Sequence, residues 1–427
     1  MKIKKILTAL TLFIFSENVN ANTLFESLSL AYSNNPKLNA ERAGMRAAKE
    51  EKREAISEFL PNVTVSGYIS EQDNTTKGDS SDSHFEPSEQ SVLVEQKIFQ
   101  GGGGIARFKK KKLGQKLGEF KLKKVEQEIL LEAAKAHTEL LLNIKKVDIN
   151  LANLDLIERQ VETDQNRLEK GEISLTDLAQ SESSLAGARA KLITAQNDLV
   201  TSKANFKKII GKKPMENMPE INEIKLNLPK SLSTAYKISN LENPGLQIAT
   251  LEFNQSKLDV TIAASELSPT ATLSYKIAEQ DDLSSTVDER TQQSVTATAT
   301  WPLFSGGSNT FNYRKFKEKE KQKDLLLQDK KKSTETEVTN AWSSYQSSKS
   351  LLDSIRSQVT AAEIANEGIT LEYESGNSRT TLEVIQSRSI LLNSKIDLAS
   401  SERNFLISQF KLLASVGRLT AKQLNLK

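Results

Sequence analysis

The chain contains one sequence unit twice, and this duplication constrains the fold more than any other feature. Asn-Pro-Lys-Leu at 35–38 returns as Asn-Pro-Gly-Leu at 243–246, 208 residues later. Ile-Phe-Gln-Gly-Gly at 98–102 returns as Leu-Phe-Ser-Gly-Gly at 303–307, 205 residues later. Because these landmarks keep their order, the chain is predicted to consist of two copies of one unit of about 206 residues. The predicted bounds are 22–213 for the first repeat, 214–230 for a linker and 231–427 for the second repeat.

Each repeat is predicted to run helix, strand, loop, strand, long helix, turn and return helix. The first helices are expected at 24–59 and 231–266, and a proline follows each of them because proline disfavours continuation of a helix. The strand pairs are expected at about 61–99 and 269–304. Their acidic, serine-rich connecting loops are expected near 71–90 and 279–292.

The strands alternate with period two, most clearly in the last of them. Its apolar residues alternate with threonines, so one face is apolar; the apolar set is Val295, Ala297, Ala299 and Trp301. Strands of about ten residues can cross a bilayer, although a half-buried soluble hairpin has the same pattern. Since a closed barrel needs about eight strands and this chain offers four, membrane strands would require several copies to share one barrel.

The helices carry heptad repeats typical of coiled coils. In the first return helix large apolar residues recur every seven positions, with a small residue three positions after most of them, which allows close helix packing. The first set is Leu178, Leu185, Leu192, Leu199 and Phe206, and its counterpart is Val384, Leu391, Leu398, Phe405 and Leu412. A long helix at 104–170 would extend about 100 Å, and the return helix at 175–210 about 54 Å. Two short helices end to end therefore match one long helix.

The N-terminus is predicted to be a secretory signal peptide covering residues 1–21. Lys2, Lys4 and Lys5 precede a short apolar run, and Ala21 ends a small-residue cleavage pattern. The mature protein is therefore expected to be exported. After residue 21 no apolar stretch approaches the length of a membrane-spanning helix, so a membrane role would rest on the strands.

The composition excludes several kinds of chemistry. Without cysteine there is no disulfide, no thiolate metal site and no lipid-modified N-terminal cysteine. The two histidines, His84 and His137, lie too far apart in the sequence to indicate a metal site. A net charge of +3 indicates no nucleic acid partner, and no set of catalytic residues or cofactor loop is present. We therefore expect no enzyme activity, no metal and no cofactor.

Over residues 22–427 the chain resembles the TolC family of outer-membrane efflux and secretion proteins. The resemblance rests on the duplication, on Phe-Leu-Pro-Asn at 59–62, on Leu-Phe-Ser-Gly-Gly at 303–307 and on the turns around Gly171 and Gly376. It implies a mainly α-helical fold with membrane β-strands. In that fold a homotrimer forms a β-barrel of twelve strands, four from each protomer, which continues into an α-barrel tunnel of antiparallel coiled-coil helices in the periplasm. It also implies a periplasmic adaptor and an inner-membrane transporter as partners, in efflux or type I secretion.

The resemblance places the two helical turns at a periplasmic gate. There Thr176 and Asp177 would face Tyr373 and Arg379, with polar links between neighbouring hairpins holding the tunnel shut. Glu383 would form a pore-lining acidic ring that favours cations. A further acidic position one helical turn on is Gln386 here, and one extra residue follows Gly376. The alternative is that these are ordinary solvated turn residues.

Two further alternatives concern the whole chain and one glycine-rich segment. A periplasmic adaptor, or a coiled-coil structural protein, also has long helices, but neither explains both the duplication and the strand pairs. Gly101 to Gly104 followed by Lys109 to Lys112 suggests a phosphate loop, yet the full motif is absent. A strand-to-helix joint with unusual backbone angles, followed by a solvated lysine face near the membrane, is the favoured interpretation.

Overall fold

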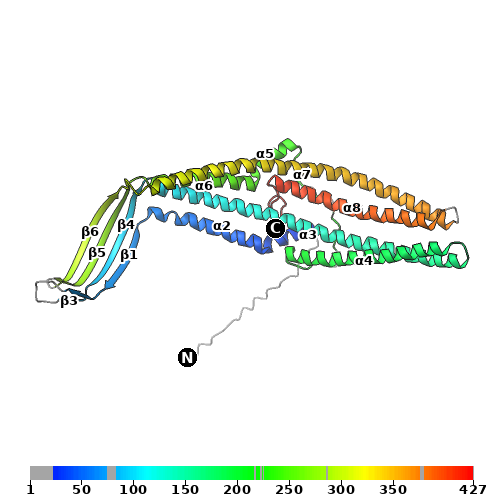
Figure 1. Ribbon diagram of the computed structural model, residues 1–427, viewed down its shortest axis with the longest axis horizontal. Helices are drawn as coiled ribbons and strands as arrows, with labels where there is room; N and C mark the ends of the chain where they lie inside the picture. Colours follow the sequence, from blue (N-terminus) through cyan, green and yellow to red (C-terminus); the bar gives the residue numbers. More distant parts are fainter. Residues whose placement is uncertain are drawn as a thin grey trace, which may run out of the picture.

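The chain folds into an elongated molecule with a β-sheet at one end and two helical hairpins at the other (Figure 1). The computed structural model describes residues 23–74, 83–215, 218–221, 224, 226–284, 287–375 and 379–426. The predicted signal peptide and Gly376 lie outside the described residues. Within them, no helix has a stretch that is both long enough and apolar enough to cross a membrane.

The two repeats have the same order of elements. The first contains α1 (Leu24–Asn34), α2 (Pro36–Glu54), a short 3-10 helix η1 (Ser57–Phe59), β1 (Asn62–Ile69), β2 (Gln72–Asn74), β3 (Ser83–Phe85), β4 (Ser88–Gln100), α3 (Gly103–Glu169) and α4 (Leu175–Ile210). The second contains α5 (Leu232–Glu242), α6 (Pro244–Ser265), β5 (Thr270–Ser284), β6 (Val287–Thr300), α7 (Ser308–Glu374) and α8 (Thr381–Ser415).

The predicted first helix of each repeat is in fact two helices, which corrects that prediction. The break falls at Asn35 and at Asn243, whose backbones are extended (φ −65° at both). Each asparagine precedes a proline, which disfavours the helical conformation in the residue before it. Its side chain then caps the next helix, accepting from the backbone amides of Leu38 and Leu246 respectively.

Four strands form one antiparallel sheet in the order β1-β4-β5-β6. The register aligns apolar side chains in a row across the sheet, from Val63 through Val94 and Tyr275 to Val295. β5 and β6 continue almost to their connection, so the predicted loop at 279–292 is wrong. Polar residues extend these strands because the ladder of backbone hydrogen bonds does not require apolar side chains. β1 and β6 are left as open edges.

The helices lie side by side in one layer. Beside the strands α3 contacts α2 and α6, and α6 contacts α7; towards the tip α3 contacts α4 and α8, and α8 contacts α7 (Figure 1). Thus α2 and α4 together flank the full length of α3, which confirms that two short helices match one long helix. The molecule has two long edges, one formed by β1, α2 and α4, the other by β6 and α7.

The glycine pairs that join strand to helix adopt left-handed backbone angles in both repeats. Gly101 and Gly102 have φ of 59° and 83°, and Gly306 and Gly307 have φ of 63° and 81°. Residues with a Cβ adopt such angles at a cost, whereas glycine does not. The interpretation of this segment as a joint, and not as a phosphate loop, is confirmed.

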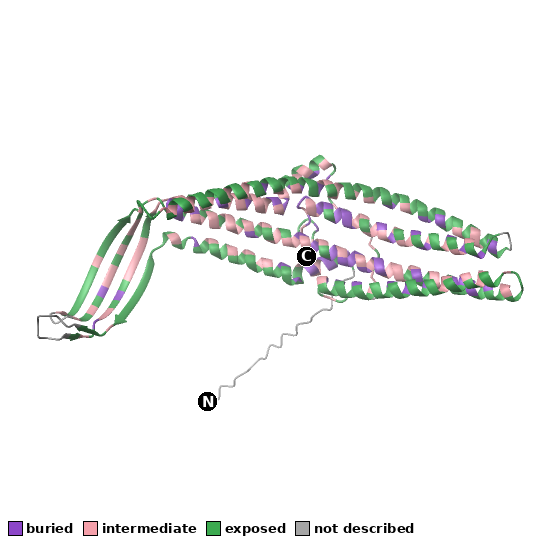
Figure 2. Cartoon of the chain, viewed as in Figure 1, coloured by how far each residue is buried: buried purple, intermediate pink, exposed green. Residues whose placement is uncertain are grey.

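The main core lies midway along the helices, where α1 packs on α3 and α4 and α8 contributes further buried residues (Figure 2). Phe206 and Phe410, which come from the return helices of the two repeats, are fully buried there. By contrast, every residue of β1 is exposed in the single chain. The sheet contributes no residue to the hydrophobic core clusters, although Ser91 and Ala278 are buried within it.

His137 is a buried base in this core. Its side chain is fully buried, Nδ1 lies 2.8 Å from the Ser27 hydroxyl, and Nε2 has no partner among the described residues. Burial lowers the pKa of His137 from 6.5 to about 4. The unfolded chain therefore binds one more proton than the folded chain between these two values, and stability falls as pH falls through this window.

We predict that this group alone removes about 1.6 kcal/mol of unfolding free energy between pH 6.5 and pH 5.0. His137→Gln, which cannot take up the proton, should be correspondingly less sensitive to acid over that interval. The urea midpoint of both proteins, measured at half-unit steps of pH, gives the comparison. Parallel pH profiles would show that His137 is not the group that titrates.

Candidate functional site

The return helices α4 and α8 begin with the same cap at the helical tip. Asp177 and Ser174 form a capping box at the start of α4, and Glu383 and Thr380 form one at the start of α8. Hydrogen bonds from Ser174 lower the pKa of Asp177, and the Thr380 amide, followed by Arg379, lowers the pKa of Glu383. Both carboxylates are therefore ionised at neutral pH and stabilise the first turn of a return helix.

A buried carboxylate, Asp164 of α3, connects four helices just inside the tip. It accepts hydrogen bonds from the hydroxyl of Tyr373 on α7 (2.8 Å), the hydroxyl of Ser181 on α4 (2.5 Å) and the amide of Gln160 one turn away (2.8 Å). Thr381 at the start of α8 lies 3.1 Å from the Tyr373 hydroxyl. Because Asp164 is fully buried, these contacts replace its lost hydration and join the two hairpins.

Tyr373 is held on a second side by a cation. The Arg167 guanidinium lies 4.5 Å from the centre of the Tyr373 ring and pairs with Glu172 at 3.1 Å. Burial raises the pKa of Tyr373, so its hydroxyl remains a hydrogen-bond donor at physiological pH. The tyrosine is thus fixed between the two hairpins by its ring and by its hydroxyl.

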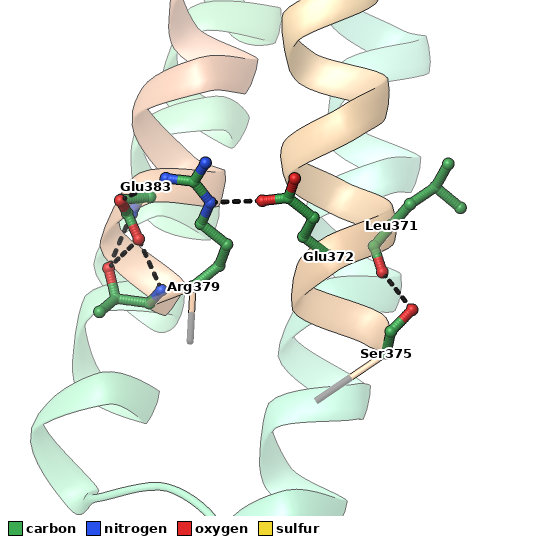
Figure 3. Close-up of polar contacts among 6 residues, drawn as sticks. Leu371, Glu372, Ser375, Arg379 and Glu383 are labelled. Carbon is green, nitrogen blue, oxygen red and sulfur yellow. Dashed lines mark hydrogen bonds and ion pairs between the residues drawn. The ribbon is translucent and has the colours of Figure 1, made fainter. Parts of the chain in front are cut away.

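Arg379 lies outside this buried cluster, on the exposed surface of the tip. It precedes α8 and reaches Glu372 on α7 at 2.6 Å, while it also contacts Glu383 at 3.1 Å (Figure 3). The arginine therefore spans the mouth of its own hairpin between the end of α7 and the start of α8. Exposed ion pairs of this kind contribute little to stability and can exchange partners.

Helix α4 carries a second heptad seam, separate from the one that packs on α3. Nine residues spaced alternately by three and four positions are all exposed, and most are small. The spacing is that of a coiled-coil interface, and Ile193 and Val200 are each 66% exposed within it. We call this set the α4 seam: Thr176, Ala179, Ser183, Ala186, Ala190, Ile193, Asn197, Val200 and Ala204.

Helix α7, on the opposite edge of the molecule, carries a matching exposed seam. It has the same alternation of three and four positions and the same number of members. Each seam has one end at the tip. The first and last members of each seam are 28 residues apart, so each seam extends about 42 Å along its helix. We call this set the α7 seam: Ser343, Ser347, Ser350, Ser354, Ser357, Ala361, Ile364, Gly368 and Leu371.

The second repeat shows what such a seam does when it has a partner. Shifted by 206 residues, the α4 seam corresponds to a stripe on α8 that includes Leu392, Ala399 and Phe410, and these three side chains are buried. Helix α8 packs on α3, and α3 is the repeat counterpart of α7. By internal symmetry, the α4 seam is therefore shaped to pack on a helix equivalent to α7.

Comparison with known families decides what kind of protein carries this architecture. The family model described as outer membrane efflux protein matches residues 27–212 and again residues 236–418, together most of the chain. The chain belongs to the outer membrane efflux protein family. The two matched segments coincide with the two copies of the duplicated fold.

Relatives of this outer membrane efflux protein agree over nearly its whole length. The outer membrane efflux protein BepC of Brucella suis is 27% identical over 95% of this chain and 88% of its own. The outer membrane protein TolC of Escherichia coli is 21% identical over 99% of this chain and 88% of its own. The outer membrane channel CmeC of Campylobacter jejuni has the same fold, with a TM-score of 0.85 at 14% identity over 93% of this chain and 86% of that one.

The family membership confirms the sequence-based resemblance, the outer-membrane location and a channel function without enzyme activity. The fold class, with its duplication, helical tunnel and β domain, is confirmed as well. This outer membrane efflux protein is thus a member of a family of efflux and secretion channels.

The predicted gate residues all lie at the tip of this efflux protein, but they do not form one cluster within a single chain. Tyr373 donates to Asp164, and Arg379 contacts Glu372 and Glu383. Among the described residues, Thr176 and Asp177 contact neither Tyr373 nor Arg379. Thr176 instead begins the α4 seam.

Asp164 was not predicted from the sequence, although its position in the α3 heptad carried a signal. It follows Val161 by three residues and precedes Leu168 by four, so it occupies a seam position of the α3 heptad. A carboxylate at such a position must find donors when the helices pack, and this one does.

Proposed function

We propose that three copies of this chain close into one continuous duct that passes efflux or type I secretion cargo across the outer membrane. The observation that carries the proposal is the exposed α4 seam, whose repeat counterpart on α8 has Leu392, Ala399 and Phe410 buried within the chain. In a ring of three, each α4 seam would pack antiparallel on the α7 seam of the next copy. Each β1 would likewise pair with β6 of the next copy, closing a barrel of twelve strands.

The ring also gives the gate residues their partners. Since both seams begin at the tip, Thr176 of one copy would lie beside Leu371 of the next. Asp177 would then approach Glu372 and Arg379 of that neighbour. We propose that Arg379 exchanges an ion pair within its own chain for one with Asp177 across this boundary. The remaining residues of the closed tip would be Thr176, Tyr373 and Asp164. Three Glu383 side chains would form the acidic ring at the entrance.

The remaining parts of the proposal concern processing and partners. Residues 1–21 would be removed on export, leaving repeats at 22–213 and 231–427 joined by the linker 214–230. Because the named relatives include efflux proteins, we propose that a periplasmic adaptor and an inner-membrane transporter deliver cargo to the tip. The alternative, a periplasmic adaptor or structural coiled coil, would leave the open edges of the sheet without a role.

We predict that Arg379→Ser leaves the trimer intact but raises its single-channel conductance in a planar lipid bilayer. The ion pairs of Arg379 are exposed, so assembly should not depend on them, whereas a closed tip held by charge should loosen. Arg356→Ser is the matched control, since Arg356 is an exposed arginine of α7 whose ion pair with Asp353 lies along the helix. An unchanged conductance in Arg379→Ser would remove this residue from the gate.

A further inference from the structure

A cluster of lysines that form no ion pair among the described residues lies just below the sheet, on one face of the helical layer. One of them, Lys257, also lies over the ring of Phe253, with its Nζ 4.2 Å from the ring centre. Lys109, Lys112 and Lys116 of α3 and Lys257 of α6 line a groove of about 490 Å³ between these two helices, whose floor includes Leu113 and Leu258. All four lysines are exposed. Among the described residues, none of the four forms an ion pair, and the groove contains no carboxylate.

The opposite face of the same helices is electrically balanced. There Lys110 pairs with Asp259 at 2.5 Å and Lys111 with Glu51 at 2.9 Å, next to a bidentate pair between Arg107 and Glu58. The excess of positive charge is therefore confined to one face of the layer. Four like charges held together without a counter-ion favour an anionic ligand.

The internal duplication places a second basic groove at the edge of the chain. Counterparts of the α3 lysines, 205 residues on, are Arg314, Lys317 and Lys321 of α7, and the counterpart of Lys257, 208 residues back, is Lys49 of α2. All four are exposed. Only Lys317 is paired within the described residues, with Glu320 at 3.3 Å. In the proposed ring, α2 of one copy adjoins α7 of the next, so this groove would form between copies.

The height of both grooves matches the surface of a membrane. Exposed aromatic side chains, Trp301 and Phe304, mark the joint between sheet and helices, as aromatic residues do at membrane interfaces. Along α3, Lys109 lies about 9 Å below this joint and Lys116 about 20 Å below it. Ile105, 54% exposed, precedes the lysines on their own face, nearer the sheet. Ile105 could contact the acyl chains of a lipid, while the lysine ammonium groups, further from the sheet, could bind its phosphate.

We propose that these grooves form a basic belt that binds the phosphate groups of anionic phospholipids in the periplasmic leaflet of the outer membrane. The inference rests on the proposed trimer for the grooves between copies, whereas the α3–α6 groove is complete within one chain. The bound lipid would fasten the helical layer to the membrane surface at the joint.

The test measures which lipids remain with the full-length protein after its extraction from vesicles of phosphatidylethanolamine and phosphatidylglycerol in mild detergent. The wild type should retain phosphatidylglycerol about tenfold above its share of the vesicle lipid, since lysines near a membrane surface attract anionic lipid. Lys→Gln at 109, 112, 116 and 257 should remove about half of that lipid. Four further substitutions should then reduce the retained phosphatidylglycerol to about its share of the vesicle lipid; these are Arg314→Gln, Lys317→Gln, Lys321→Gln and Lys49→Gln.

A matched control and two further readouts make the outcome decisive. Lys→Gln at 203, 208, 411 and 422 changes the same charge far from the sheet and should retain the lipid. If the first variant retains as much phosphatidylglycerol as the wild type, the proposal is overturned. It is also overturned if inorganic phosphate raises the melting temperature of the wild type as much as phosphatidylglycerol does. Mass and conductance are measured on the same preparation. A conducting trimer without enrichment refutes the belt alone, whereas a non-conducting monomer refutes the duct.

Discussion

Ile193→Glu combined with Val200→Glu should convert the trimer into monomers. Both side chains are two-thirds exposed in one chain but would be covered by α7 of the next copy. In the proposed register they lie opposite Ser354 and Ser347, which offer no positive charge. Burying an unpaired carboxylate costs about 3 kcal/mol or more, and the ring repeats that cost at three interfaces. Light scattering in mild detergent gives the oligomeric mass.

The neighbouring residues provide the control for this prediction. Thr194→Glu with Thr201→Glu places the same charges on the same helix, one position outside the α4 seam, where both threonines are exposed. This variant should remain a trimer. If both variants dissociate, the loss reflects charge on α4 in general; if neither does, α4 is not the interface.

Asp164→Ala should open the tip and raise single-channel conductance several-fold. The substitution removes the acceptor shared by Tyr373 and Ser181, and so one buried polar connection between the hairpins. Buried donors left without an acceptor cost about 1–3 kcal/mol each, which favours separation of the helices and entry of water. The increase should exceed that of Arg379→Ser, because Asp164 is buried and Arg379 is exposed.

Two variants separate this effect from general damage. Asp164→Asn keeps an acceptor oxygen in place and should conduct at an intermediate level. Asp155→Ala removes an exposed carboxylate from the same helix, paired only along that helix with Arg159, and should behave as the wild type. Wild-type conductance in Asp164→Ala would show that the buried cluster does not hold the tip closed.

The sequence predicted the long elements well because their signals are repeated. Heptads bounded by Gly171 predicted α3 and α4 to within a residue or so, and the alternating strands predicted the sheet. The helix breaks at Asn35 and Asn243 were missed because the apolar periodicity continues across them. The length of β5 and β6 was missed because their outer halves are polar, and polar strands lack the alternation on which the prediction rests.

The functional surfaces were harder to predict for a different reason. The α4 and α7 seams consist largely of serine and alanine, whose burial leaves little hydrophobic signal, so neither seam was predicted from the sequence. Their heptad spacing was nevertheless present in the sequence. Asp164 was overlooked because a charged residue within a helix is usually solvated, and only the three-dimensional arrangement shows its three donors.

The central claim, a closed ring joined through α4 and α7, is tested most directly by disulfide cross-linking. The natural chain has no cysteine, so Ala190→Cys with Ser357→Cys introduces a single possible pair at facing positions of the two seams. Because these helices form opposite edges of one chain, a bond between them must join neighbours. We predict one covalent species of three chains on non-reducing electrophoresis. Ala190→Cys with Ser343→Cys, displaced by about 21 Å along α7, should remain monomeric. Uncross-linked chains in the first variant, or an open ladder of many lengths, would contradict the ring.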